Sequence, residues 1–225
     1  MTPLNLFPTL IALFENSSHS EHKNIFNNKY SHLKYDEVGE QHGQNKTHHD
    51  EHFQEFYKFV VNSANDYLRH LNMNTDNFYL VIAKSWMSFV NSNNGVPAHN
   101  HSDHHLSFTY YIDVPKDSCD VICFYDNKRN TNEPFYGAFN SNIGSPPNSF
   151  GDNMYNSLNY TLKIKEGQLC IFPSKLDHYV PKGNFKNERK CIAGDLLLIY
   201  KNSNNKNPWG LYKPENWKYY ETKMD

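Results

Sequence analysis

The residues best suited to chemistry lie in a short histidine-rich stretch between Gly95 and Pro115. Four histidines and one aspartate fall within the seven positions from His99 to His105. Imidazole and carboxylate side chains are the ligands that iron, zinc, nickel and manganese take in proteins. The stretch runs directly into an apolar, β-prone segment that begins at Leu106. It is therefore the first candidate for a metal site.

The alternation of side chains along a strand limits which of these residues could share one ion. Side chains two positions apart lie on the same face, so His99, His101 and Asp103 would project together. His101 with Asp103 is an HxD pair, which with one distant histidine makes the facial triad of non-haem Fe(II) oxygenases. His99 with His101 is the alternative local pair, and His104 and His105 cannot both be ligands. A histidine-rich surface loop without metal would show the same pattern.

A second group of residues, further along the chain, could complete such a site. The run QLCIFPSKLDHYV, from Gln168 to Val180, is typical of an apolar strand followed by a second strand that contains His178. Arg189 opens the strand-like run RKCIAGDLLLIY. Arginine can hold a carboxylate with two parallel hydrogen bonds and keeps its charge when partly buried. Alone, Arg189 would suit a surface salt bridge with Glu188, but beside a metal site it indicates an anion clamp.

The elements that must position these residues are mostly short β-strands. Strands are expected at 4–14, 78–83, 85–90, 106–114, 120–125, 158–164, 168–172, 178–180 and 189–200. One helix is expected over 53–71, because apolar residues recur there at steps of three and four, and Thr47 or Asp50 could cap its start. The pattern is typical of a mainly β sandwich or jelly roll with one main N-terminal helix packed on it.

The remaining segments are expected to form turns and loops. Glu166-Gly167 is expected to be a tight turn, and the polar region 15–47 is interpreted as solvated loop. Segment 127–156 is too long for a simple connection and is interpreted as a lid, a binding loop or a disordered segment. The tail from 202 onward contains aromatic residues and is expected to pack back on the domain.

Length, charge and cysteine content narrow the class of protein. The 225 residues are expected to form one domain, with a core at about 78–200. The net charge of -2 comes from 22 basic and 24 acidic side chains without a basic stripe, so no nucleic-acid partner is expected. No apolar run predicts a membrane span, and the N-terminus lacks the features of a signal peptide. The four cysteines are interpreted as reduced buried thiols, and a cytoplasmic location is expected.

Several pieces of the chain, in order and spacing, resemble a family of 2-oxoglutarate- and Fe(II)-dependent oxygenases found in phages and marine bacteria. The pieces are SWMSFV, AHNHSDHHLSFTYYIDVP, ICFYD, KEGQLCIFPSKLDHYVP and ERKCIAGDL. The resemblance implies a prolyl-hydroxylase-like jelly roll, the double-stranded β-helix, with iron near one open end. It also implies Fe(II), 2-oxoglutarate and O2, with ascorbate as a reductant, and the host cytoplasm if a phage encodes the protein.

The resemblance also assigns roles to individual residues. Carried over by position, it makes His101 and Asp103 the first two metal ligands and His178 the third. Arg189 becomes the anchor for the distal carboxylate of 2-oxoglutarate. Members often carry an HxH motif, so His99 with His101 stays open as the local pair.

Two departures from the family pattern concern the second partner of that carboxylate. Ser107-Phe108 stands where many members carry SG, and Cys191 stands where the wider class often places Ser or Thr. Tyr111 is the candidate replacement, although it would equally suit a core position.

The function that the resemblance implies is that of a 2-oxoglutarate-dependent dioxygenase. Such an enzyme would hydroxylate an unidentified substrate, a peptide or a small molecule, with release of succinate and CO2. The alternative is a cupin-like metal-binding module without oxygenase activity. The sequence leaves the oligomeric state open.

Overall fold

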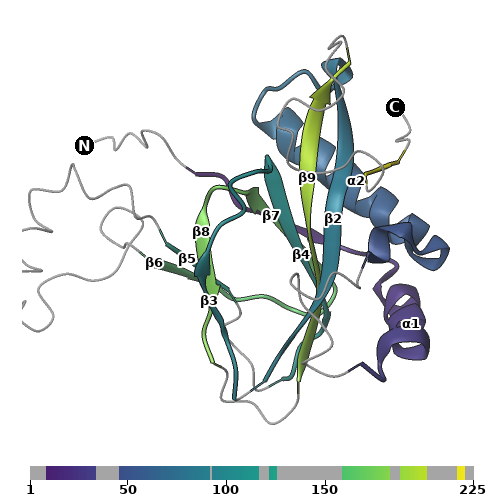
Figure 1. Ribbon diagram of the computed structural model, residues 1–225, viewed down its shortest axis with the longest axis vertical. Coiled ribbons are helices and arrows are strands. Elements are labelled where there is room, and N and C mark those ends of the chain that lie inside the picture. Colours follow the sequence, from purple (N-terminus) through teal and green to yellow (C-terminus); the bar gives the residue numbers. More distant parts are fainter. Residues whose placement is uncertain are drawn as a thin grey trace, which may run out of the picture.

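Two antiparallel β-sheets face each other, and two helices cover the outer side of the larger sheet (Figure 1). The structure is a computed structural model. It describes residues 9–33, 46–91, 93–116, 122–125, 159–182, 188–201 and 217–220. Within these ranges the expectation of a mainly β fold with one main helix is confirmed. The segment 127–156 and Cys119 lie outside the described residues.

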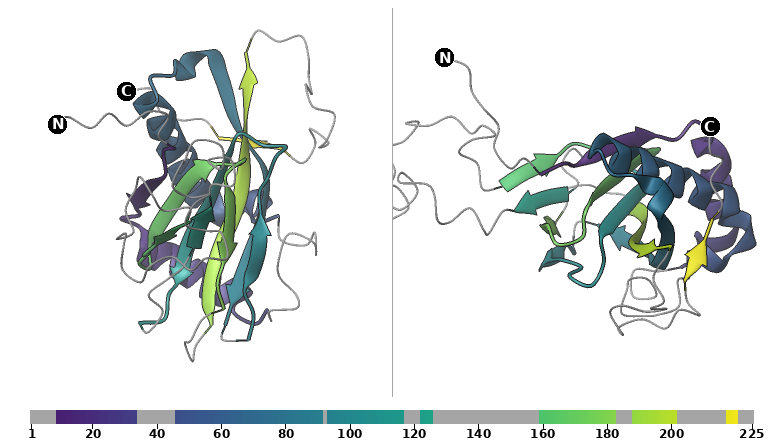
Figure 2. Two further views of the ribbon diagram at one scale, coloured as in Figure 1. Left: turned by 90° about the vertical axis from the view of Figure 1, so that its left-hand side faces the viewer. Right: turned by 90° about the horizontal axis from the view of Figure 1, so that it is seen from above.

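The larger sheet has the strand order β1-β7-β4-β9-β2-β10. Its members are β1 (Ala12–Glu15), β7 (Gln168–Pro173), β4 (Leu106–Asp113), β9 (Arg189–Tyr200), β2 (Phe78–Val90) and β10 (Lys218–Tyr219). The smaller sheet has the order β3-β8-β5-β6. It consists of β3 (Val96–His99), β8 (Asp177–Val180), β5 (Ile122–Tyr125) and β6 (Asn159–Leu162). Seen from above, the helices lie on the side of the larger sheet that faces away from the smaller sheet (Figure 2, right).

The long pair β2 and β9 forms the centre of the larger sheet. The pairing extends from Phe78 opposite Tyr200 to Val90 opposite Arg189. The two strands expected at 78–83 and 85–90 are one strand, in which the register shifts between Ile82 and Lys84. A local irregularity of this kind breaks the alternation of side chains, which explains why the sequence suggested two strands.

The main helix, α2 (Gln54–His70), packs its apolar face on the larger sheet. Its buried residues include Phe56, Tyr57, Val60, Val61, Ala64, Tyr67 and Leu68. Three short 3-10 helices flank it: η3 (Thr47–His49), η4 (Glu51–Phe53) and η5 (Thr75–Asn77). Each large apolar side chain that is fully buried contributes about 1.5–3 kcal/mol to stability, so this face fixes the helix to the sheet. No described helix is long and apolar enough to cross a membrane.

A second helix, α1 (His19–Tyr30), lies in the region interpreted from the sequence as solvated loop, and that interpretation is wrong for these residues. Only His22 and Phe26 of this helix are buried, so the apolar periodicity that reveals a helix is almost absent. Polar contacts hold α1 to the sheet instead. The imidazole of His19 lies 2.7 Å from the Tyr110 hydroxyl, and Lys23 Nζ donates to Glu166 Oε1 at 2.8 Å.

Both ends of the described chain return to the larger sheet. β1 pairs with β7, and β10 pairs with β2. The buried Tyr220 donates its hydroxyl hydrogen bond to the carbonyl of His48 at 2.7 Å. The expectation that the tail packs back is therefore confirmed for 217–220. The turn at Glu166-Gly167 is also present, and Gly167 has a φ of 84° there, a conformation that glycine adopts readily.

Asp50 joins the start of η4 to the end of α1, and its ionisation should contribute to stability. Its carboxylate accepts hydrogen bonds from the Tyr30 hydroxyl, from Lys29 Nζ at 3.3 Å and from the His52 amide at 2.9 Å. Burial would raise the pKa of this carboxyl, but the hydrogen bonds from Tyr30 and His52 outweigh burial and hold the pKa below its ordinary value. Asp50→Asn should therefore lower the free energy of unfolding by about 1–3 kcal/mol at pH 7.

The stability lost in Asp50→Asn should become smaller as the pH falls. A carboxyl whose pKa is lower in the folded state stabilises the fold above its unfolded-state pKa, about 3.9 for Asp, and loses that contribution as the pH falls further. Urea unfolding should show the gap between wild type and Asp50→Asn narrowing below about pH 4. Glu55→Gln removes an exposed carboxylate whose ion pair among the described residues is with Lys58. It should change stability by less than about 0.5 kcal/mol. A gap that stays constant down to pH 3 would contradict this role for Asp50.

Candidate metal centre and anion pocket

Two of the predicted ligands meet as a cross-strand pair in the smaller sheet. His99 is the last residue of β3 and lies directly opposite His178 on β8. Residues opposite each other in an antiparallel pair project to the same face. The two imidazole ring centroids are accordingly 4.3 Å apart.

His101 joins this pair from the loop that follows β3. Its amide donates to the Ser174 carbonyl at 2.8 Å, which ties the loop to the residue after β7. Its ring stacks on His178 with centroids 5.3 Å apart and on Trp86 with centroids 5.5 Å apart. The side chains of His101 and His178 are buried, whereas His99 is partly exposed. The ring of His101 is therefore held in one orientation before any ligand binds.

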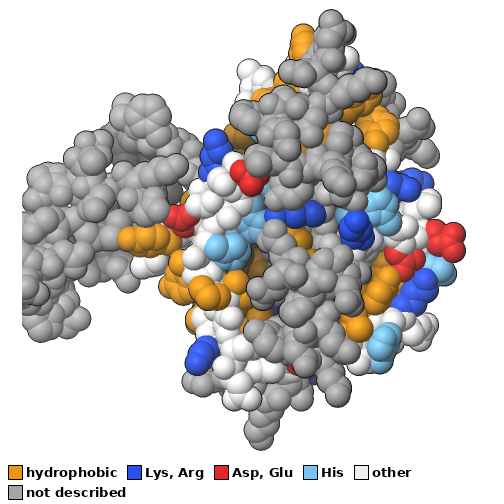
Figure 3. Space-filling model, viewed as in Figure 1, with side chains coloured by type: hydrophobic (Ala, Val, Ile, Leu, Met, Phe, Trp, Pro, Cys, Tyr) orange, Lys and Arg blue, Asp and Glu red, His pale blue; other side chains and the backbone are white. Residues whose placement is uncertain are grey.

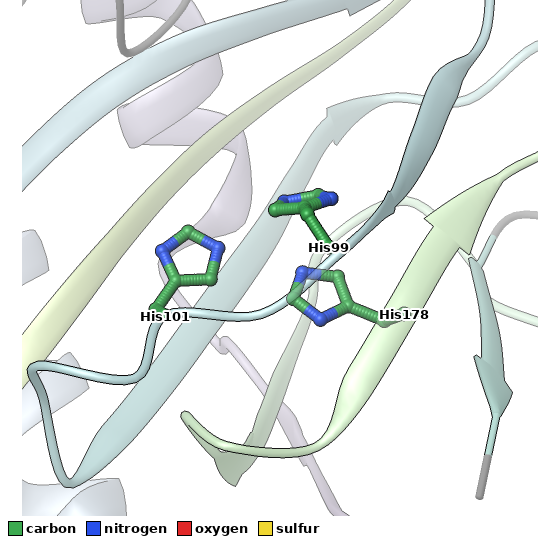
Figure 4. A group of neighbouring side chains, drawn as sticks. All are labelled: His99, His101 and His178. Atoms are coloured by element: carbon green, nitrogen blue, oxygen red, sulfur yellow. The ribbon is translucent and has the colours of Figure 1, made fainter. Parts of the chain in front are cut away.

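The three histidines bring their ring nitrogens together in one group. Their candidate ligand atoms all lie within 4.8 Å of one another, and the rings face a common point in the close-up view (Figure 4). Imidazole nitrogens bind divalent metals at about 2.0–2.1 Å, so small rotations of the rings would bring all three onto one ion. Histidine side chains also reach the surface beside the smaller sheet in the space-filling view (Figure 3), so the region is open to solvent there.

The hydrogen bonds of the three rings decide which nitrogen each one offers. Nδ1 of His99 lies 2.8 Å from the Pro97 carbonyl, and Nδ1 of His178 lies 3.0 Å from the Leu176 carbonyl. Nδ1 of His101 lies 2.9 Å from a carboxylate oxygen of Asp195. Carbonyl and carboxylate oxygens only accept, so each Nδ1 carries the proton and each Nε2 is left with a lone pair. All three rings therefore present the same nitrogen to a metal.

Burial also favours the neutral, metal-binding form of His178. Desolvation lowers the pKa of His178 to about 4. The neighbouring His104 is buried as well, and desolvation lowers its pKa to about 4. A neutral imidazole is the form that binds a metal. At neutral pH His178 is therefore in the neutral form that a metal requires.

The structure places Asp103 outside this group. β3 ends at His99, and the amide of His104 donates to the His101 carbonyl at 3.1 Å, which closes a turn around 102 and 103. The alternation of a strand therefore does not continue to Asp103, whose side chain is exposed. His105 also points elsewhere, because its Nδ1 accepts from the Leu198 amide at 3.1 Å. Of the two local pairs considered from the sequence, the structure brings His99 with His101 next to His178.

Arg189 lines the same pocket as the three histidines. It is the first residue of β9 and is only 2% exposed. Its Nε and Nη1 groups have no hydrogen-bond partner among the described residues. A buried cation with unsatisfied donors is costly. The arrangement is suited to an anion that enters the pocket and accepts two hydrogen bonds.

Two further side chains of the pocket lie close to Arg189. The Tyr111 ring centroid is 6.0 Å from the guanidinium carbon, and the Tyr111 side chain is 1% exposed. Burial raises the pKa of Tyr111 well above its ordinary value, so its hydroxyl stays protonated and able to donate. Cys191 is a buried free thiol, and burial raises its pKa to about 11. Both side chains line the pocket beside the anchor proposed from the sequence.

Asp195 was not singled out from the sequence. It is fully buried in the middle of β9, between Gly194 and the apolar run that begins at Leu196. Its position in the sequence could have revealed it, because a charged side chain within an apolar strand is buried and requires partners. Only the three-dimensional structure shows that one of these partners is His101.

The part of the chain that carries this site is similar to a known protein family. Residues 84–195 match a family described as "Putative 2OG-Fe(II) oxygenase", where 2OG stands for 2-oxoglutarate. The matched residues include all three histidines, Arg189 and Asp195. No curated protein matches the chain in sequence.

Solved structures with a similar fold include the following three proteins. The non-heme alpha ketoglutarate dependent epimerase SnoN of nogalamycin biosynthesis is 9% identical with a TM-score of 0.54, covering 92% of this chain and 86% of that one. A Pseudomonas putida prolyl-4-hydroxylase is 8% identical with a TM-score of 0.50, covering 84% and 92%. HygX from Streptomyces hygroscopicus, solved with nickel and 2-oxoglutarate bound, is 10% identical with a TM-score of 0.50, covering 84% and 81%.

At these identities the structural likeness establishes the fold, and the expected jelly roll is confirmed. The family match adds what the fold alone does not, because fold and function are separable. Residues 84–195, the segment that builds the histidine group and the anion pocket, match the model of the 2OG-Fe(II) oxygenase family.

Proposed function

We propose that the protein is an Fe(II)- and 2-oxoglutarate-dependent dioxygenase that hydroxylates a peptide or a small molecule. In this proposal His99, His101 and His178 hold the metal, and Arg189 holds the distal carboxylate of 2-oxoglutarate. The observation that carries the proposal is the buried Arg189, whose Nε and Nη1 lack partners among the described residues, in one pocket with three imidazoles. A metal chelate at one end and a guanidinium at the other match the two ends of a keto dicarboxylate.

The residues present fit the implied metal and cosubstrate. Three Nε2 atoms with lone pairs suit Fe(II), and the guanidinium supplies parallel donors for a carboxylate. Bound Fe(II) and 2-oxoglutarate would supply O2 activation coupled to conversion of 2-oxoglutarate into succinate and CO2. The protein's own contribution is to orient these groups and to keep bulk water away.

The walls of the pocket include aromatic side chains, which are suited to orienting bound groups and excluding bulk water. Phe172 packs its ring edge-on to His178, with centroids 4.8 Å apart, and Trp86 covers His101. Both aromatic side chains line the pocket with Arg189. Apolar walls lower the local dielectric constant and strengthen the attraction between the guanidinium and a carboxylate. Hydroxylation is the outcome that we propose, although the epimerase of similar fold shows that this architecture also serves other reactions.

The all-histidine group also favours a second candidate function. The facial triad typical of non-haem Fe(II) oxygenases contains a carboxylate, and the group of described residues that could hold the ion contains none. Three imidazoles alone would suit a cupin-like module that binds a divalent metal without oxygenase activity. The buried Arg189 argues against this alternative, because a module that only binds metal has no need of a guanidinium in the same pocket.

Turnover of 2-oxoglutarate without substrate separates the two functions. Purified protein supplied with Fe(II), ascorbate, 2-oxoglutarate and O2 should form succinate slowly, as measured by mass spectrometry. Parallel reactions with a chelator or without O2 should form none. Protein that binds one equivalent of Fe(II) yet forms no succinate above these controls would contradict the dioxygenase and favour the metal-binding module.

A further inference from the structure

A buried carboxylate lies directly behind one of the proposed metal ligands. Oδ2 of Asp195 accepts from His101 Nδ1 at 2.9 Å, and Oδ1 accepts from the Ser107 hydroxyl at 2.5 Å. Lys84 Nζ lies 3.1 Å from Oδ2. The Asp195 side chain is completely buried. A carboxylate in such a place must be compensated by partners, and the three contacts supply that compensation.

Sheet register explains how these groups meet. Asp195 on β9 lies opposite Lys84 on β2 and opposite Ser107 on β4. Along β9, Arg189 and Asp195 are an even number of residues apart, so both side chains project to the same face of the strand. One strand therefore carries the proposed carboxylate anchor at its start and the carboxylate that contacts His101 further along.

We propose that Asp195 is a positioning residue for the metal centre, an inference that rests on the metal site of the proposed function. Asp195 holds the proton of His101 on Nδ1 and fixes the plane of the ring, so that Nε2 is directed at the metal. A carboxylate behind a ligating imidazole also raises the basicity of the ligand, and its loss typically costs 10- to 100-fold in metal affinity. Lys84 balances the charge of Asp195, so the carboxylate is compensated even before His101 is counted.

His101 is the imidazole that this carboxylate orients. His104 Nδ1 lies 3.7 Å from the same oxygen, beyond hydrogen-bond distance. The other two proposed ligands direct their Nδ1 atoms to backbone carbonyls instead. Among the three proposed ligands, the loop-borne His101 is the one whose Nδ1 hydrogen-bonds to a side chain rather than to a backbone carbonyl in the described residues.

Metal affinity without turnover tests the role of Asp195. Titration with Co(II), followed by its visible absorption, should show binding to Asp195→Asn that is 10- to 100-fold weaker than to wild type. Ser107→Ala is the matched control, because it removes the other hydrogen bond to the same carboxylate and leaves the His101 contact in place. It should change Co(II) affinity by less than about threefold if orientation of His101 is what matters.

The protonated nitrogen of His101 gives a second readout in the metal-free protein. Histidine-ring 1H–15N spectra should show the proton of His101 on Nδ1 in wild type. The double variant Lys84→Met/Asp195→Leu replaces the buried ion pair by apolar groups of similar size, a change that folded proteins often tolerate. It should show the proton moving toward Nε2, together with the same loss of Co(II) affinity, and it replaces Asp195→Asn if that variant does not fold.

The outcomes separate this inference from the proposed function. Wild-type protein that fails to bind Co(II) overturns the metal site itself. Wild-type protein that binds Co(II), with equal affinity in the folded Asp195 variants, overturns only the positioning role. A His101 ring protonated on Nε2 in metal-free wild type overturns it as well.

Discussion

Replacing Arg189 by methionine is expected to weaken the binding of 2-oxoglutarate to the metal-loaded protein by roughly 30-fold or more. Truncating one partner of a buried charge pair costs about 2–5 kcal/mol. The guanidinium is 2% exposed, and its Nε and Nη1 have no partner among the described residues, so a bound carboxylate would take both hydrogen bonds. Calorimetric titration of 2-oxoglutarate into the anaerobic Fe(II) protein measures the loss. Fe(II) affinity without 2-oxoglutarate should change little, because Arg189 is not among the ligands.

Lys190→Met is the matched control for this change. Lys190 is the next residue on β9, and its ammonium lies over the Phe26 and Phe89 rings on the helix side of the sheet. The variant removes the same charge from the same strand without reaching the pocket, so 2-oxoglutarate affinity should stay near that of wild type. Arg189→Lys should recover only part of the affinity, since a lysine cannot form two parallel hydrogen bonds. Equal affinities for Arg189→Met and wild type would rule out Arg189 as the anchor.

The second large effect concerns the choice between His99 and Asp103 as the metal ligand. His99→Ala should weaken Fe(II) binding by at least about 100-fold, because it removes one of three directly coordinating groups, whereas loss of a supporting residue alone costs 10- to 100-fold. Asp103→Ala should leave Fe(II) affinity within about threefold of wild type, since Asp103 is exposed in a turn outside the histidine group. Anaerobic Fe(II) titration of both variants, followed by the visible band that forms with 2-oxoglutarate, measures the contrast.

The opposite result for the two variants would indicate that His101 and Asp103, the HxD pair, are the local metal ligands. If Asp103→Ala abolishes the visible band while His99→Ala retains it, the loop from 100 to 105 must rearrange when the metal binds. Asn100→Ala is a useful control in the same loop. The Asn100 side chain donates to Asp177 at 2.6 Å and is absent from the histidine group, so its loss should affect Fe(II) binding only weakly.

The fold could be predicted largely because most of its strands are bounded by clear signals. The runs that became β4, β7 and β9 are apolar and β-prone, and Gly167 marks a turn that needs its positive φ. α1 could not be predicted from the same kind of pattern. Apart from the buried Phe26, its contacts with the sheet are mainly polar and come from residues far away in sequence, such as Tyr110 and Glu166.

Site residues on predicted strands could be located from the sequence, whereas those whose position depends on a turn or on strand register could not. His178 and Arg189 each lie on a strand, and the structure puts both in the pocket with His101. Asp103 was favoured because a carboxylate completes the facial triad. Its placement beside His101 assumed that the strand continues past His99, where the chain turns. Asp195 depends on register between three strands, which the sequence of one strand cannot show.

The charge balance of the pocket follows from its all-histidine group. No acidic side chain lines the pocket among the described residues, and as metal ligands the three imidazoles are neutral. With Arg189 present, a divalent ion would bring the groups that face the pocket to a formal charge of about +3, which is unfavourable between apolar walls. A dicarboxylate that chelates the ion and meets Arg189 removes two of these charges. The cosubstrate then serves as the counter-ion of the metal, and by linkage each should tighten the binding of the other.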